Sequence, residues 1–323
     1  MTIELRLIRH ALAVGRYGNF ARAAEALHLT QPSLSRSIAS LESALGVTLF
    51  DRTTKGVTPT ASGRVLLKRG QEMLDREAAL CREIGQLEGL ESGTLVIAAG
   101  PYPAETQVAE AVARVARAHP RLRIECRALE PLQVVSDVLT ERADVGISTV
   151  DGLEHEPRLV VEPLPQRRAY IACRPGHPLT LEPALTLERV LQFPLVSTVL
   201  RGAQAAASHQ GSGAEGDYVP HVLVNSVAVA KVIARGSDLL VPGSAATLAD
   251  EVAAGRLVIL DVDAPAMRTR YGLYYLRERA LAPAARVFVD TLHRVEAETP
   301  VEWAAPPAVD RACGAPRKRQ PSS

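Results

Sequence analysis

The sequence lacks the features that mark metal-binding, disulfide-stabilised and membrane-spanning proteins. Its four cysteines, Cys81, Cys126, Cys173 and Cys313, are far apart and include no Cys-x-x-Cys pair, so neither a zinc site nor a disulfide framework is indicated. No apolar run approaches the length of a membrane span, and charges interrupt the first ten residues, where a secretory signal would stand. We therefore expect reduced thiols, no metal or other cofactor, no membrane association and a cytoplasmic location.

Catalytic motifs are missing as well. The chain has no Gly-x-Ser-x-Gly elbow, no phosphate loop and no His-Glu-x-x-His, and its eight histidines show no ligand spacing. One Gly-x-Gly-x-x-Gly match, at 211–216, neither follows a strand pattern nor precedes a helix, so it fails the context that a dinucleotide site requires. These absences predict that the protein is not an enzyme and has no catalytic residues.

Length and charge distribution indicate several domains with different partners. A chain of 323 residues exceeds the usual size of one core, so two or three domains are expected. The net charge of +1 hides a basic segment, residues 1–70, with ten Lys or Arg against four Asp or Glu, and a basic C-terminus at 308–323. The residues between them are acidic overall. A basic head on an acidic body suggests a polyanionic partner at one end.

The first sixty residues predict three short helices and a hairpin. Leu5 to Leu12 is one amphipathic helix ending near Gly15, while Asn19 and Thr30 can cap the second and third helices. Two helices joined this tightly form a helix-turn-helix. Residues 47–60, with β-branched residues around a polar turn, indicate a hairpin that serves as a wing.

The third helix has an unusual outer face. Opposite its apolar stripe of leucine and isoleucine it carries serines around Arg36, with Gln31 just before them. A recognition helix lies in a DNA major groove about 12 Å wide, and small side chains let its backbone approach the base edges. Gln31 can pair with adenine and Arg36 with guanine.

Residues 61 to about 90 predict a single long helix. Apolar residues recur along it every seven residues, with one addition: Leu66, Met73, Leu80, Leu87 and Ile84. Such a seam suits a short coiled coil between two chains. The alternative is a single helix packed against its own domain. Polar residues from Glu88 to Gly93 then predict a hinge.

From Thr94 short apolar strands alternate with helices. The expected strands are Leu95–Ala98, Leu122–Arg127, Val145–Ser148, Ala169–Cys173, Leu195–Ser197, His221–Val224, Leu239–Val241, Leu257–Leu260 and Tyr271–Leu276. The expected helices lie near 104–118, 132–142, 226–235, 244–254 and 283–297. This rhythm predicts an open, mostly parallel sheet, which binds ligands beyond the carboxyl ends of its strands. The Pro- and Ala-rich end is expected to be a disordered basic tail.

Several motifs of the first 67 residues resemble the N-terminal signature of LysR-type transcriptional regulators. They are Phe20-Ala-Arg-Ala-Ala-Glu-Ala-Leu27, Thr30-Gln-Pro-Ser-Leu-Ser-Arg-Ser-Ile38, Leu45-Gly-Val-Thr-Leu-Phe-Asp-Arg52 and Thr58-Pro-Thr-Ala-Ser-Gly63. The resemblance implies an α/β protein with a winged helix-turn-helix at 1–60, a long linker and dimerisation helix at 61–92, and a two-lobed effector domain of the periplasmic-binding-protein type (type 2) at 93–298. Lobe I would comprise about 93–163 and 267–298, lobe II about 164–266, and the tail 299–323.

The resemblance also implies DNA contacts. In the family, residues around this Gln-Pro lie in the groove, which carries the role onto Gln31, Pro32, Ser33, Ser35 and Arg36. On the wing, Arg52 and Lys55 are expected to reach flanking phosphates or the minor groove. Arg22 and Arg64 can add backbone contacts, although either can equally be a solvated surface cation.

Two segments after strands resemble the family's effector-contacting turns. In the first, Gly100, Pro101 and Tyr102 stand where the family often has a hydroxyl, which leaves the effector's chemistry open; the second is Ser197-Thr-Val-Leu-Arg-Gly202. The candidate effector-binding residues are Gly100, Pro101, Tyr102, Thr149, Ser197, Thr198, Arg201 and Asn225. The alternative roles are packing on the cleft rim for Tyr102, and capping or turn formation for Thr149 and Asn225.

The favoured function is a sequence-specific DNA-binding transcriptional regulator that binds a small metabolite, expected to be an organic anion. Its partners would be double-stranded DNA, the effector, further copies of itself in a dimer or tetramer, and RNA polymerase. One alternative is an enzyme on the α/β half with an ancillary DNA-binding head. A solute-binding protein, which would need a secretory signal, and a redox sensor using Cys126 and Cys173 are weaker alternatives.

Overall fold

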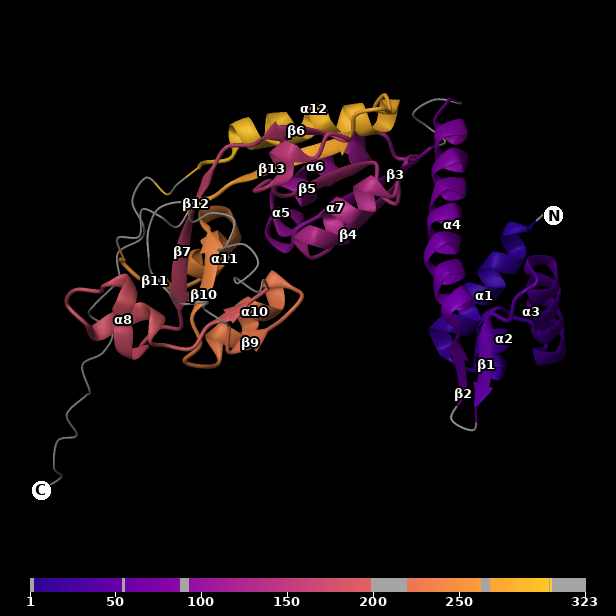
Figure 1. Cartoon of the computed structure of the whole chain (residues 1–323). Helices are drawn as coiled ribbons and strands as arrows, with labels where there is room; N and C mark the ends of the chain where they lie inside the picture. Colours follow the sequence, from indigo (N-terminus) through magenta and orange to yellow (C-terminus); the bar gives the residue numbers. More distant parts are fainter. Residues whose placement is uncertain are drawn as a thin grey trace, which may run out of the picture. The chain divides into compact units, whose positions relative to one another are not determined.

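The computed structural model describes residues 3–53, 56–87, 93–198, 220–262, 268–301 and 303 (Figure 1). The chain divides into two compact units. The N-terminal unit comprises Met1–Ile84 with Thr140–Arg142, and the C-terminal unit comprises Gly85–Leu139 with Ala143–Ser323. No helix among the described residues is long and apolar enough to cross a membrane.

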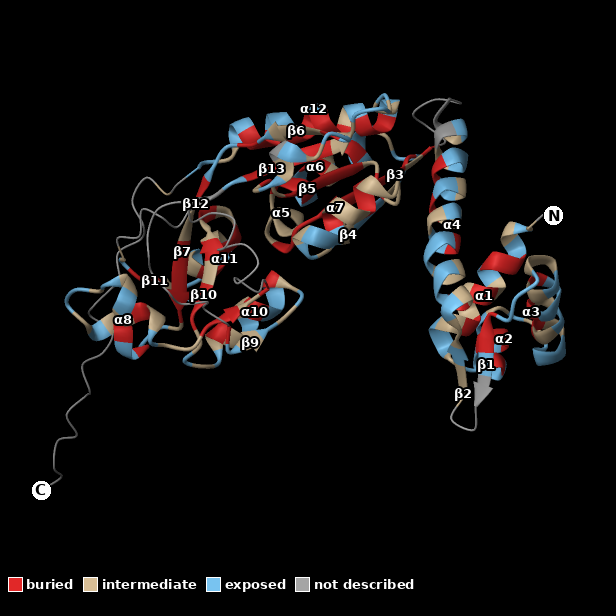
Figure 2. Cartoon of the chain, viewed as in Figure 1, coloured by how far each residue is buried: buried red, intermediate tan, exposed pale blue. Residues whose placement is uncertain are grey.

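The N-terminal unit is a winged helix-turn-helix followed by a long helix. Its elements are α1 (Leu5–Tyr17), α2 (Phe20–Ala26), α3 (Gln31–Leu45), β1 (Phe50–Thr53), β2 (Gly56–Pro59) and α4 (Ala61–Leu87). The strands β1 and β2 pair antiparallel to form the wing. The apolar stripe of α3 is buried at Leu34, Ile38 and Leu41, which pack with Phe20 and Leu49 in one core (Figure 2).

The predicted end of the first helix near Gly15 is wrong. Helix α1 continues to Tyr17 and ends at Gly18, whose φ of 59° is the left-handed conformation that glycine adopts readily. Gly15 lies inside the helix, where a β-carbon would stand only 2.7 Å from Leu67 of α4. The glycine therefore permits close helix packing and does not stop the helix.

The start of α4 is fixed by Thr60 and Gly63. The Thr60 hydroxyl donates to the carbonyl of Thr48 at 2.8 Å and accepts from the Gly63 amide at 3.0 Å. A β-carbon on Gly63 would lie 2.1 Å from the Leu49 carbonyl oxygen, so no side chain fits there. This junction joins the wing to the long helix.

The predicted seam of α4 is partly wrong. Leu66 packs against the core of the helix-turn-helix instead of facing outward. Met73, Leu80 and Ile84 are exposed, together with Val65. The side chain of Leu87 lies outside the described part. An exposed apolar stripe therefore remains along the second half of the helix, at steps of seven and four residues.

The C-terminal unit has two lobes, each built on its own sheet. Lobe I contains a five-stranded sheet in the order β4-β3-β5-β13-β6. Its strands are β3 (Thr94–Ala99), β4 (Arg123–Ala128), β5 (Val145–Thr149), β6 (Leu159–Pro163) and β13 (Tyr271–Leu276). Helices α6 (Gln107–Ala118) and α12 (Pro283–Glu298) pack on one face, and α7 (Pro131–Leu139) on the other. Short turns α5 (Pro101–Glu105) and η1 (Leu153–His155) complete the lobe.

Lobe II is built around one central strand. Strand β7 (Arg167–Cys173) pairs antiparallel with β10 (Val241–Ser244), β11 (Val258–Ile259) and β12 (Arg268–Thr269). Helices α10 (Val227–Arg235) and α11 (Ala245–Ala253) pack in one core cluster of this lobe. A second cluster contains residues of α8 (Leu187–Leu191) and η2 (Pro178–Leu181). The short strands β8 (Val196–Ser197) and β9 (Val222–Leu223) pair in parallel.

The expected mostly parallel sheet is not observed. Only β3 pairs in parallel with its two neighbours in lobe I, whereas β13 is antiparallel to both β5 and β6. The chain leaves lobe I after β6, builds lobe II, and returns as β13, which inserts between β5 and β6. Strand β13 enters the sheet from the end that faces lobe II, so it runs antiparallel to β5 and β6.

The ordered chain continues past the predicted start of the tail at residue 299. Arg167 donates to the Pro300 carbonyl at 2.8 Å, and the Trp303 amide donates to the Tyr170 hydroxyl at 3.1 Å. The Trp303 and Tyr170 rings pack with centroids 4.9 Å apart. The segment after α12 is therefore attached to β7 of lobe II. Residues 304–323 lie outside the described residues, and so does the predicted hinge from Glu88 to Gly93 except for Gly93 itself.

Candidate functional site

The first candidate surface is the outer face of α3. The Thr30 hydroxyl caps this helix by accepting from the Ser33 amide at 3.4 Å, and Pro32 occupies its first turn. Gln31, Pro32 and Arg36 are exposed. Ser33 and Ser35 are half-buried. The structure thus presents a polar helix end with an amide and a guanidinium that can reach a ligand.

The wing is attached to α3 through a carboxylate. Glu42 of α3 accepts hydrogen bonds from the amides of Leu49, at 2.7 Å, and Phe50, at 3.3 Å. Arg52 stands in β1 opposite Val57, while Lys55 lies outside the described residues. Because the bonds fix where β1 begins, they fix the position of the wing relative to the recognition helix.

The two additional arginines have different surroundings. Arg22 is exposed on α2. Arg64 donates from Nη1 to the Pro59 carbonyl at 3.0 Å, so its guanidinium lies at the base of the wing. Neither environment excludes contact with a phosphate.

The second candidate site is a cavity of about 220 Å³ between the lobes of the C-terminal unit. Lobe I contributes Gly100, Pro101, Tyr102, Gln107, Ser148 and Thr149 to its wall. Lobe II contributes Ala169, Ile171, Leu195, Ser197, Gly243 and Ser244. A cavity with walls from two lobes is suited to a ligand that controls their closure.

Five of the predicted effector-binding residues line this cavity. They are Gly100, Pro101, Tyr102, Thr149 and Ser197. Thr198 is fully buried, and its hydroxyl has no hydrogen-bond partner among the described residues. Asn225 is exposed and is not among the described lining residues. Arg201 and the 211–216 glycine motif lie outside the described residues.

Sequence reasoning missed several lining residues, above all Gln107, Arg167 and Arg168. The arginine pair at the start of β7 was a usable sequence signal for the cavity wall. This strand follows directly after the chain crosses from lobe I to lobe II, so its first residues lie between the lobes. Gln107 had no signal in the sequence, since it opens α6 as an ordinary polar residue. Only the folded chain brings it beside the cavity.

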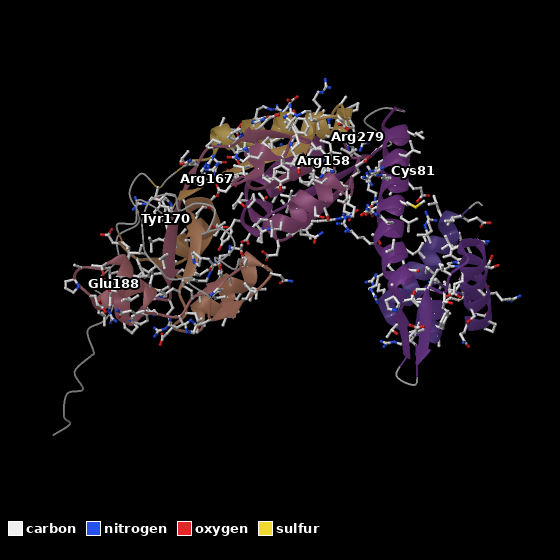
Figure 3. The ribbon with its side chains drawn as sticks, in the orientation of Figure 1. Cys81, Arg158, Arg167, Tyr170, Glu188 and Arg279 are labelled. Carbon is white, nitrogen blue, oxygen red and sulfur yellow. The ribbon has the colours of Figure 1, made fainter. Side chains whose placement is uncertain are left out.

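Arg167, labelled in Figure 3 near Tyr170, is neutralised by a buried network beside the cavity. Its Nε donates to the Tyr271 hydroxyl at 2.9 Å, and its Nη2 pairs with the Glu296 carboxylate. The Tyr271 hydroxyl in turn donates to Glu296 at 2.6 Å. Burial and the neighbouring carboxylate raise the pKa of Tyr271. The network joins β7, the first strand of lobe II, to β13 and α12 of lobe I.

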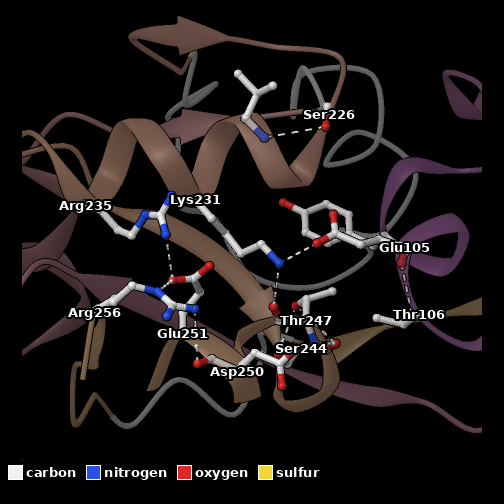
Figure 4. Close-up of polar contacts among 12 residues, drawn as sticks. Glu105, Thr106, Ser226, Lys231, Arg235, Ser244, Thr247, Asp250, Glu251 and Arg256 are labelled. Carbon is white, nitrogen blue, oxygen red and sulfur yellow. Dashed lines mark hydrogen bonds and ion pairs between the residues drawn. The ribbon is translucent and has the colours of Figure 1, made fainter. Parts of the chain in front are cut away.

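Two polar contacts join the lobes next to the cavity. The Tyr102 hydroxyl donates to the Pro242 carbonyl at 3.3 Å. Lys231 of α10 pairs with Glu105 of α5 and also donates to the Thr247 carbonyl at 3.1 Å (Figure 4). These contacts hold α5 of lobe I against lobe II.

The two described cysteines of the C-terminal unit, Cys126 and Cys173, are not activated thiols. Burial raises the pKa of Cys173 to about 12, and partial desolvation raises the pKa of Cys126, although that residue is exposed. Since the thiolate is the reactive form, neither environment favours oxidation near neutral pH. Among the described residues, no three His, Cys, Asp or Glu side chains are grouped to hold a metal ion.

Comparisons with known proteins agree with both halves of this description. Residues 5–64 match the family model of the bacterial regulatory helix-turn-helix protein, lysR family, and residues 88–297 match the LysR substrate binding domain. The chain is 36% identical over 302 residues to the SDS degradation transcriptional activation protein of Pseudomonas sp. (strain ATCC 19151), covering 92% of this chain and 98% of that protein.

Solved structures show the same fold. The crystal structure of CbnR, a LysR family transcriptional regulator, superimposes with a TM-score of 0.66 at 18% identity, covering 91% of this chain and 99% of that chain. Full-length CbnR complexed with its target DNA gives a TM-score of 0.65 at 18% identity, over 91% and 100% of the two chains. These similar proteins are transcriptional regulators and not enzymes. The chain therefore belongs to the LysR family, as an effector-responsive DNA-binding transcriptional regulator.

Proposed function

We propose that this regulator reads its operator with the exposed face of α3, through Gln31, Pro32, Ser33, Ser35 and Arg36, and holds the DNA backbone with the wing residues Arg52 and Lys55. The observation that carries the proposal is the exposure of Gln31 and Arg36 on a helix whose other face is buried in the core. The half-buried serines between them keep the helix narrow enough for the major groove.

Fluorescence anisotropy tests this assignment. The full chain is titrated with DNA from upstream of its own and neighbouring genes, and with scrambled DNA of equal length, at near-physiological salt. Selective binding that is lost in Gln31→Ala and Arg36→Ala supports the proposal. Arg117→Ala is the matched control, because it removes one exposed cation from α6 of the other unit. Equal binding to both DNAs that depends only on salt would mean that the N-terminal unit binds DNA electrostatically and without sequence selectivity.

The effector is proposed to be a small organic anion that binds between the lobes. No carboxylate is among the described residues of the cavity wall, and of its two arginines Arg167 is paired with Glu296, so the net positive charge of the wall comes from Arg168. The similar Pseudomonas protein is named for SDS degradation, and SDS is itself an organic anion. A ligand that binds one arrangement of the lobes better than another would shift the population of arrangements and so alter transcription.

The regulator is further proposed to act in the cytoplasm as a homodimer or larger oligomer joined through α4. Met73, Leu80 and Ile84 form the exposed apolar stripe that a second copy would cover. Light scattering of a Leu80→Glu variant tests this: dissociation to monomers is expected, and an unchanged mass would place the interface elsewhere. Contact with RNA polymerase is also proposed for the promoter-bound form.

A further inference from the structure

The wall of the cavity between the lobes is mostly apolar. Prolines contribute much of it, at Pro101, Pro103, Pro131, Pro220 and Pro242, and aliphatic side chains contribute Ile171, Leu191 and Leu195. Proline and aliphatic surfaces offer no hydrogen bonds, so a ligand with many hydroxyls would lose bonds to water there without replacement. The body of a well-matched ligand must therefore be apolar.

The polar side chains that the structure describes in this wall are all able to donate a hydrogen bond. They are hydroxyls, one amide and the two arginines, with neither aspartate nor glutamate among them. The amino end of α11 also meets the wall, where Gly243 and Ser244 lie, and its dipole favours negative charge. A ligand group that accepts hydrogen bonds can therefore be bound by these side chains, whereas a cation finds no carboxylate among them.

Gln107 is a buried residue whose amide nitrogen has no partner among the described residues. Its side chain is on the first residue of α6, lines the cavity and belongs to a residue only 4% exposed. The Oε1 atom lies within hydrogen-bond distance of the Thr106 hydroxyl, whose one proton is also within reach of the Tyr102 carbonyl at 3.0 Å, while Nε2 has no partner among the described residues. Because a buried donor left without an acceptor destabilises the protein, a ligand oxygen at this position would be favoured.

We propose that the effector is an amphiphilic organic anion, whose apolar chain or ring lies against the proline and aliphatic wall and whose oxygen-bearing head group accepts a hydrogen bond from Gln107. This inference rests on the proposed function of the cavity as the effector site. It adds the ligand class and a residue that determines specificity. Cations lack a carboxylate partner in the described wall, and polyols or small dianions have no apolar part to cover its proline and aliphatic surface.

The protein contains its own reporter for this binding. Trp303 is the single tryptophan of the chain and packs on Tyr170 of β7, the strand that supplies Ala169 and Ile171 to the cavity wall. Titration of the full chain with sodium butyl, hexyl and octyl sulfate, below their micelle concentrations, is followed by tryptophan fluorescence and by calorimetry. Sodium octanoate, octyltrimethylammonium and succinate complete the series.

The dependence of affinity on the length of the alkyl chain tests whether the ligand needs an apolar body. Each added methylene should tighten binding about fourfold, since burying one contributes about 0.8 kcal/mol. Octanoate should bind and octyltrimethylammonium should not. Succinate binding as tightly as octyl sulfate, or affinity that does not change with chain length, would overturn the proposal.

Variants of Gln107 test the head group. Gln107→Glu replaces the donor by a carboxylate and should weaken octyl sulfate binding by about tenfold or more through charge repulsion. Gln107→Leu removes the donor without adding charge, and should weaken binding less while keeping the dependence on chain length. Gln192→Glu is the matched control, because this exposed side chain accepts from Arg189 at 2.9 Å and a carboxylate would accept as well.

Circular dichroism and thermal unfolding verify that each variant is folded. Unchanged affinity in folded Gln107→Glu would overturn the role of Gln107. The DNA-binding experiment is independent of these ligands. If alkyl anions fail while operator binding is selective, only the ligand class is wrong; if operator selectivity fails, the proposed function itself fails.

Discussion

The two units of this chain present their functional residues in different ways. In the N-terminal unit the candidate DNA contacts lie within six consecutive residues of one helix, from Gln31 to Arg36, and on the hairpin that follows. In the C-terminal unit the cavity is assembled from segments between residues 100 and 271 of the sequence. A groove is read by one exposed face, whereas a cavity needs walls from several elements. The first kind of site is therefore local in sequence and the second is not.

The units also differ in how they keep their functional residues in place. The α3 surface depends on capping and on an apolar stripe, each set by a few neighbouring residues. The cavity depends on long-range polar contacts such as Arg167 with Glu296 and Lys231 with Glu105. Substitutions should consequently affect one function without the other, and the following predictions test that separation.

The largest effect is expected from Gly63→Val. Because even a β-carbon would meet the Leu49 carbonyl at 2.1 Å, the junction of wing and α4 must shift, at a cost of at least about 3 kcal/mol. Operator binding in the anisotropy assay should be lost, while the Trp303 response to octyl sulfate should persist. If both are retained, Gly63 does not position the wing.

The next largest effect is expected from Glu296→Gln in the C-terminal unit. It leaves the buried Arg167 guanidinium without its carboxylate, and breaking such a pair costs about 3–5 kcal/mol. Thermal unfolding should show a lower midpoint for this unit, with unchanged DNA affinity of the head. Glu298→Gln, which removes an exposed partner of Arg114 at 2.7 Å, is the control and should change the midpoint little.

A smaller and more specific effect is expected on α3. Arg36→Ala should reduce discrimination between operator and scrambled DNA by about 1–3 kcal/mol, because Arg36 is proposed to contact a base. Arg22→Ala should instead weaken binding to both DNAs alike and lower the salt dependence. Anisotropy titrations at several salt concentrations separate the two outcomes. Equal losses of discrimination in both variants would refute the assignment of Arg36.

The sequence predicted the N-terminal unit well because its signals are local. Spacing of apolar residues located α3, and Asn19 and Thr30 were correctly identified as caps. The errors there arose from contacts distant in sequence: Gly15 serves packing against Leu67, and Leu66 packs on the core instead of the seam.

In the C-terminal unit most strands were found, with β6 and β12 missed, but their pairing was not predicted. The direction of β13 depends on the chain's return from lobe II, more than a hundred residues after β5, and no local pattern records it. Gln107 was missed for the same reason, whereas Arg167 and Arg168 at the start of β7 were a local signal that was not used. Of the predicted cavity residues, those directly after a strand, such as Gly100 and Thr149, do line the cavity, because strand ends meet at one edge of a sheet.

The smallest predicted effect concerns the pH dependence of lobe II. Burial lowers the pKa of His177 below its ordinary 6.5; its Nδ1 accepts from the Leu179 amide at 3.2 Å. The neutral form is thus favoured by folding, so the stabilisation is fully present above about pH 6.5 and is lost as the pH falls toward the folded-state pKa. Chemical unfolding of wild type and His177→Asn between pH 5 and 8 measures this. Parallel pH profiles of the two proteins would contradict the role of His177.

The central claim is that one chain joins operator recognition by α3 to effector binding between the lobes. The most direct measurement is the affinity of octyl sulfate, detected through Trp303, for the free protein and for the protein saturated with operator DNA. If the anion changes the affinity of the protein for DNA by some factor, DNA must change the affinity for the anion by the same factor. We expect affinities that differ by about fivefold or more. Equal affinities, with both ligands bound, would contradict the claim that this anion acts as the effector.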